Sequence, residues 1–185
     1  PAAVAVAAVQ PAPVVQAKPA PVRSVISSVA ISPLDPNLIF VTSRANGVFV
    51  SKDAGQTWSH STVGEKTMSI TPSPVNKDEV YLAAGSSRVM RSTDGGASWT
   101  SISTGIANDF FAREVAVSPF APHQLVCIGK TGWNGTIYRS NDNGASWTPF
   151  DRLAPESATD TSGETVRLSR PSNLTISPVV PGLMF

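Results

Sequence analysis

Short stretches in which apolar and polar residues alternate recur along the chain from Ser24 onward. Alternation of this kind is typical of half-buried strands, and no helical period of about 3.6 residues competes with it. The pattern predicts three successive units of four strands. These strands are expected at residues 27–32, 38–42, 47–51 and 59–62; at 67–71, 80–83, 88–92 and 100–103; and at 114–118, 124–128, 136–140 and 148–150. The chain is therefore predicted to be all-β.

A second pattern, S-x-D-x-G-x-[ST]-W, connects the third expected strand of each unit to the fourth. Its members are Ser51, Asp53, Gly55 and Trp58; Ser92, Asp94, Gly96 and Trp99; and Ser140, Asp142, Gly144 and Trp147. The Asp–Gly centre indicates a tight turn, because Gly adopts positive φ at little cost and Asp accepts backbone N–H bonds locally. The three aspartates lie 41 and 48 residues apart, which is the length of a four-stranded propeller blade.

A Ser/Thr-Pro step ends the first expected strand of each unit. The steps are Ser32-Pro33, Thr71-Pro72 and Ser118-Pro119, and a fourth, Ser177-Pro178, follows an apolar run that begins at Leu174. We therefore expect a β-propeller of antiparallel four-stranded blades with three blades and the start of a fourth. Propellers close with about four to eight blades. Further blades of the same protein, or another chain, are expected to complete the ring.

The repeated box, with the V-x-[IV]-[ST]-P and L-[IV]-[FV] runs before it, resembles the Asp-box (bacterial neuraminidase repeat) propellers. The resemblance covers about residues 24–185. Similar repeats occur in sialidases, sortilin-type receptors, xyloglucan-cleaving endoglucanases and a photosystem assembly factor, which have unrelated functions. The resemblance implies that the box joins the third and fourth strands and that its Trp packs inward. The twelve box residues named above are accordingly interpreted as structural, without a metal.

In such propellers ligands usually meet the face opposite the boxes. On this sequence that face is expected to carry the loops between the second and third strands and the loops between blades. The candidate ligand-binding residues there are Arg44, Arg88, Asp109, Phe110, Phe111, Arg113, Lys130, Trp133 and Asn134. Trp133 suits stacking on a sugar ring or packing against a neighbouring blade, and Phe110-Phe111 suits a ligand cluster or an apolar plug. Residues 151–172 are expected to be a binding loop or a disordered insertion.

Composition narrows the functional classes. Fourteen basic and thirteen acidic residues leave no general attraction to nucleic acid or anionic membranes. One cysteine, Cys127, excludes an internal disulfide framework and a multi-Cys metal site, and its apolar surroundings indicate a buried thiol. Residues 1–23, rich in Ala, Val and Pro, are interpreted as a linker or processed segment before a propeller at 24–185, and they are too short to span a bilayer. No cofactor is expected.

Two functions remain compatible with these observations. The first is a secreted or surface-exposed propeller that binds a glycan or a protein through its loop face without chemistry. The second is a fragment of a glycoside hydrolase, similar to the xyloglucanase-type endoglucanases, with catalytic carboxylates partly outside this chain. Glycosidases use two carboxylates, and no spacing in this sequence specifies such a pair. The Ala/Val/Pro-rich segment and the resemblance favour an extracytoplasmic location.

Overall fold

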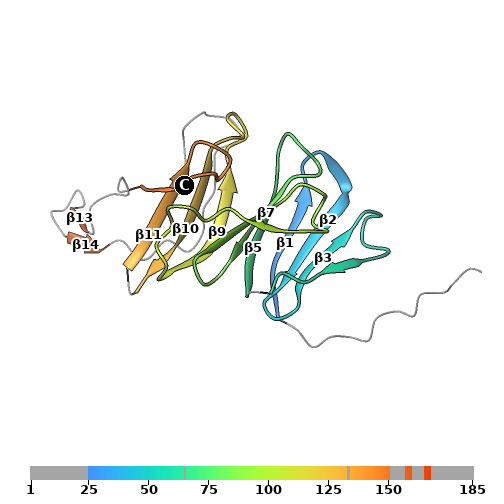
Figure 1. Cartoon of the computed structure of the whole chain (residues 1–185), viewed down its shortest axis with the longest axis horizontal. Helices are drawn as coiled ribbons and strands as arrows, with labels where there is room; N and C mark the ends of the chain where they lie inside the picture. Colours follow the sequence, from blue (N-terminus) through green and yellow to red (C-terminus); the bar gives the residue numbers. More distant parts are fainter. Residues whose placement is uncertain (1–24, 65, 133, 151–156, 160–164, 168–185) are drawn as a thin grey trace, which may run out of the picture.

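The computed structural model describes residues 25–64, 66–132, 134–150, 157–159 and 165–167. Within these residues the regular structure consists of strands, which form three four-stranded antiparallel sheets and one small hairpin. Figure 1 shows the three sheets side by side, each turned relative to the next. This is the arrangement of neighbouring propeller blades. The all-β propeller fold predicted from the sequence is confirmed, and the described part supplies three blades.

Each blade is a meander in which consecutive strands pair. Blade 1 contains β1 (Ile26–Ser32), β2 (Asp35–Ser43), β3 (Gly47–Ser51) and β4 (Ser59–Ser61). Blade 2 contains β5 (Thr67–Pro72), β6 (Val80–Ala84), β7 (Arg88–Ser92) and β8 (Thr100–Ser101). Blade 3 contains β9 (Phe110–Val117), β10 (Leu125–Thr131), β11 (Asn134–Ser140) and β12 (Thr148–Pro149). The first strands are neighbours, because β1 contacts β5 and β5 contacts β9.

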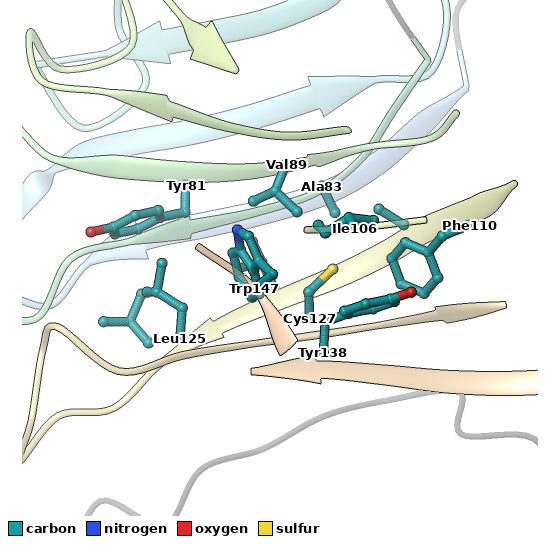
Figure 2. Packing of buried hydrophobic residues seen from close by; sticks show 12 residues of the cluster. Tyr81, Ala83, Val89, Ile106, Phe110, Leu125, Cys127, Tyr138 and Trp147 are labelled. Carbon is teal, nitrogen blue, oxygen red and sulfur yellow. The ribbon is translucent and has the colours of Figure 1, made fainter. Parts of the chain in front are cut away.

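Two apolar clusters hold the blades together, one at each boundary. The even-numbered side chains of β2 and β3, such as Phe40 and Val48, pack against Leu82 and Met90 of blade 2. The opposite side of blade 2 packs on blade 3 in the cluster that Figure 2 shows, where Tyr81 and Val89 face Leu125, Cys127, Tyr138 and Trp147. Blade 2 is thus buried on both sides, and its strands alternate between two neighbours rather than between core and solvent.

Strand pairing corrects one feature of the predicted repeat. Pro72 pairs with Val80, as Ile31 pairs with Ile39 and Val117 with Leu125. The residue equivalent to Ser32 and Ser118 is therefore Ser73, and the matching step is Ser73-Pro74 rather than Thr71-Pro72. The hydroxyl of buried Ser73 accepts the backbone N–H of Asn76 at 3.3 Å, which closes the turn.

Blade 3 differs from its predicted boundaries on the face opposite the boxes. Strand β9 begins at Phe110, four residues before the expected start, so Phe110 and Phe111 lie in a strand rather than in a loop. Strands β10 and β11 remain paired up to Thr131 and Asn134, which replaces the predicted long loop by an extended hairpin. Trp133 lies outside the described residues.

The C-terminal predictions fall mostly outside the described residues. Within the segment 151–172, a hairpin pairs β13 (Ser157–Thr159) with β14 (Thr165–Arg167). The predicted fourth copy at Leu174 and the predicted linker 1–23 are not described, and the domain boundary near residue 23 stays a prediction. Over the described ranges, no helix has the length and apolar character needed to cross a bilayer.

A basic cavity opposite the Asp boxes

The boxes form three nearly identical turns. In the second box the Ser92 hydroxyl donates to Asp94 Oδ1 at 2.7 Å and accepts the backbone N–H of Gly96 at 2.8 Å. Both carboxylate oxygens of Asp94 are used, since Oδ1 accepts the Ser98 N–H at 2.9 Å and Oδ2 accepts the Ser98 hydroxyl at 2.5 Å. The first and third boxes repeat this arrangement. The box side chains thus close their own turns.

These hydrogen bonds also fix the charge of the box carboxylates. Donation from the hydroxyl and N–H of Thr57 lowers the pKa of Asp53 to about 2. The hydroxyls of Ser140 and Ser146 lower that of Asp142 to about 2, and contacts with Ser98 hold the pKa of Asp94 far below its usual range. A carboxylate that stays ionised and fully hydrogen-bonded is poorly suited to general acid chemistry. The boxes are structural turns.

The three box tryptophans do not lie in the same environment. Trp147 is 3% exposed and donates its indole N–H to the Ile102 carbonyl of blade 2 at 2.5 Å, and Trp99 donates to Ser61 of blade 1 at 3.2 Å. Trp58 is 42% exposed and donates to Gly55 of its own turn. The prediction that every box Trp packs inward is therefore wrong for Trp58. The boxes of blades 2 and 3 pack on the preceding blade, and the described residues include no blade before blade 1.

The face opposite the boxes carries a cavity of about 310 Å³. Its lining combines four cationic side chains with apolar ones: Arg44, Lys66, Arg113 and Lys130 with Met68 and Phe111. Arg44 and Lys66 also line a larger neighbouring cavity of about 890 Å³. The volumes are within the range of ligand sites. Among the described lining residues of both cavities there is no carboxylate, so the site is strongly cationic.

Bulges in the first strands aim residues at this region. In each blade the pairing with the second strand skips one residue, namely Ser27, Met68 and Arg113. The three positions are equivalent, and all three residues line a further cavity of about 390 Å³ beside the first. A bulge redirects a side chain that regular pairing would place on one face of the sheet. The fold therefore brings the same position of three blades to one place.

Phe111 forms an apolar wall of the site because of a glycine opposite it. A Cβ built on Gly85 would come within 2.8 Å of the Phe111 ring, so the ring rests directly on the blade 2 backbone. Phe110 points the other way. It is 1% exposed, its ring lies 4.9 Å from that of Tyr138, and a Cβ on Gly129 would meet it at 2.6 Å. The ligand role predicted for Phe110 is thus wrong, because it is a core residue.

The structure brings together part of the predicted site. Arg44, Phe111, Arg113 and Lys130 meet at the 310 Å³ cavity. Arg88 lines a separate cavity with Ser86 and Asn108, and Asp109 is exposed outside the cavities described above. Trp133 and the side chain of Asn134 lie outside the described residues. Lys66 and Met68 were missing from the prediction. The position of Lys66 in an inter-blade loop could have indicated it, whereas Met68 depends on a bulge that the sequence does not reveal.

Comparison with known proteins adds the family. The model of the photosynthesis system II assembly factor YCF48 matches residues 16–172. The chain belongs to this family. No curated protein matches the sequence. The family model covers the three blades and the hairpin β13–β14, and it agrees with the propeller resemblance predicted from the boxes.

Solved structures support the same fold. YCF48 from Cyanidioschyzon merolae is 24% identical with a TM-score of 0.59, and the match covers 73% of this chain and 39% of that one. A structure of YCF48 bound to D1 peptide is 15% identical with a TM-score of 0.53, covering 83% and 43%. The GH74 xyloglucanase from Xanthomonas campestris is 21% identical with a TM-score of 0.57, covering 69% and 21%. At these identities the likeness shows the fold alone, and the chain spans less than half of each structure.

Proposed function

We propose that this chain is part of a non-catalytic propeller that binds a protein partner, and that its basic cavity receives a segment of that partner. The observation that carries the proposal is the cluster of Arg44, Lys66, Arg113 and Lys130 around an apolar wall made by Phe111 and Met68. Cations at this density attract carboxylates, and guanidinium groups bind them in paired hydrogen bonds. The preferred occupant is an extended segment that carries carboxylates beside an apolar side chain.

The comparisons with known proteins favour a protein as the partner. The matching family model is that of an assembly factor, and one similar structure is YCF48 bound to D1 peptide. Both point to recognition of a polypeptide rather than to chemistry. The hydrolase alternative has less support here. A glycosidase needs two carboxylates, and among the described residues the three cavities of this face are lined by one, Glu114. Glycan binding, secretion, an extracytoplasmic location and the sortilin-type resemblance stay predictions.

Binding of a fluorescein-labelled D1 peptide, followed by anisotropy, tests the proposal. We expect the chain to bind the peptide, and binding to weaken with added salt, because screening reduces attraction between exposed charges. Hydrogen bonds to charged groups contribute about 1.5–3 kcal/mol each. Arg113→Ala or Lys130→Ala should therefore weaken binding roughly tenfold or more. A peptide whose carboxylates are converted to amides should bind weakly and lose the dependence on salt.

The chain offers a matched control in Lys52→Ala. Lys52 is exposed beside the first box, on the opposite face, and its removal changes the net charge as Lys130→Ala does. Equal weakening by both substitutions would mean that only overall charge matters, and the cavity would lose its assigned role. Phe111→Ala tests the apolar wall separately. It should weaken binding without altering the salt dependence.

A further inference from the structure

Eight large apolar side chains are exposed in the described part of the protein. Five of them belong to the first strand region or the box of blade 1, which no described blade precedes: Val25, Ile26, Val29, Ile31 and Trp58. The other three lie in three different blades. They are Leu34, Val75 and Phe120, which are 48%, 55% and 48% exposed. We call these three residues the apolar tips.

The apolar tips occupy one equivalent position of the repeat. Each follows a Ser-Pro step in the turn between the first and second strands, and the strand pairing makes Ser32, Ser73 and Ser118 equivalent. Single exposed apolar residues are ordinary on protein surfaces. Outside blade 1's uncovered face, however, the described blades expose such residues at this one position only. A scatter of ordinary surface residues does not account for that regularity.

The turns that carry the apolar tips are held rigidly. Ser32 Oγ accepts the N–H of Leu34 at 3.3 Å, and Ser118 Oγ accepts the N–H of Ala121 at 3.2 Å. Each turn is also tied to the box of its blade by a backbone hydrogen bond, such as Gly95 N–H to the Asp78 carbonyl at 2.8 Å. The apolar tips are therefore kept in water by fixed backbone. A preordered surface loses little entropy when it binds a partner.

The apolar tips lie at the same end of the molecule, the box end, in the turns that follow β1, β5 and β9. Adjacent first strands are in contact, and the turns that leave them at this end are therefore neighbours. The described charges at this end, apart from the Glu79–Arg91 ion pair, are five aspartates, two lysines and Arg139, which gives −2 with His123 neutral. The aspartates are Asp35, Asp53, Asp78, Asp94 and Asp142 and the lysines are Lys52 and Lys77. This end is acidic, whereas the cavity end is basic.

From these observations we propose that the box end is a second protein-binding surface. The apolar tips contact apolar side chains of a partner segment, and the surrounding aspartates attract Lys or Arg that flank those side chains. The acidic charge disfavours an anionic membrane surface as the occupant, because such a surface would be repelled. The proposal is separate from the basic cavity, so one propeller segment holds two partner segments of opposite charge.

The test uses the whole chain and a labelled amphipathic peptide built from Leu and Lys. We expect it to bind, to bind less at high salt, and to bind about tenfold or more weakly to the triple variant Leu34→Ser, Val75→Ser, Phe120→Ser. The variant should unfold at a lower temperature than the unmodified chain, because about half of each apolar tip is buried, so binding is compared at a temperature where circular dichroism shows both proteins to be folded. The matched controls are Arg113→Ala, which should leave this binding unchanged, and a Leu/Glu peptide, which should not bind at this end.

Three results would overturn the proposal. The first is no binding of the Leu/Lys peptide, or equal binding to the triple variant. The second is loss of binding in the variant for the Leu/Glu peptide as well, which would indicate a general apolar surface without charge selection. The third is capture of the protein by vesicles of anionic lipid through the apolar tips, which would assign the surface to a membrane. None of these results bears on D1 peptide binding at the cavity.

Discussion

A comparison of Trp147→Ala with Trp58→Ala tests whether packing on the preceding blade stabilises a box. A buried Trp removes roughly 150–250 Å² from water. At about 25 cal/mol per Å², this burial corresponds to about 4–6 kcal/mol. Trp147 is 3% exposed, so nearly all of that contribution is lost, together with about 1 kcal/mol for its hydrogen bond to the Ile102 carbonyl.

Trp58→Ala is the matched control, because it removes the same side chain from the same position of another box. Trp58 is 42% exposed, so a little over half of the area is buried and the expected loss is about 2–3.5 kcal/mol. Its indole bonds only within its own turn. The two variants should therefore differ by about 3–3.5 kcal/mol in the free energy of unfolding.

Equilibrium urea unfolding followed by far-ultraviolet circular dichroism measures this difference, since most of the signal comes from the backbone rather than from the tryptophan that is removed. Comparable slopes with urea would show that the unfolded states are equally compact in the two variants. If Trp58→Ala destabilises the chain as much as Trp147→Ala does, the boxes do not derive their stability from the preceding blade. The packing argument would then be refuted.

Three further predictions concern the core and the turns. Gly105→Ala should destabilise the chain more than Gly95→Ala. Both residues have positive φ, but a Cβ on Gly105 would meet the Trp147 carbonyl at 2.3 Å, whereas one on Gly95 would meet nothing within 4 Å. Thermal unfolding of the two variants measures the difference in stability. Hydrogen bonding lowers the pKa of Asp53 and Asp142 from 3.8 to about 2. The ionised carboxylates therefore stabilise the folded chain fully above about pH 4, and this contribution to the free energy of unfolding is lost as the pH falls toward about 2. The urea midpoint should fall across this range, and Asp142→Asn should make its fall with pH less steep. Burial raises the pKa of the Cys127 thiol far above its usual range. An aromatic disulfide reagent should therefore label this thiol only when the chain unfolds. Fast labelling of the folded chain would contradict the described core.

The strand pattern and the boxes could be read from the sequence because they depend on local chemistry. Alternation predicted the strands of blades 1 and 2 to within a few residues, and the Asp–Gly turns are confirmed in all three boxes. The start of β9 was missed because a bulge interrupts the alternation. Ile128 pairs with Glu114 and Gly129 with Ala112, so Arg113 is skipped and the period of two breaks there.

The site was predictable only in outline. Arg44 and Lys130 could be assigned to the correct face, because a meander places the second hairpin of every blade at the same end. Which residues of that face share a cavity depends on how the blades stack, and stacking is a long-range property. Phe110 and Phe111 illustrate this limit, since the two rings are adjacent in sequence and one lies in the core while the other lines the cavity.

In blades 2 and 3, the box packs against residues that come earlier in the chain. The tryptophans of the boxes in blades 2 and 3 donate hydrogen bonds to residues that precede them in the chain, Ser61 and Ile102. During synthesis the surface that receives each box has therefore already left the ribosome when the box appears. A repeat protein whose neighbour contacts run this way can add one blade at a time as the chain grows, because no finished blade has to wait for later sequence to cover its own box.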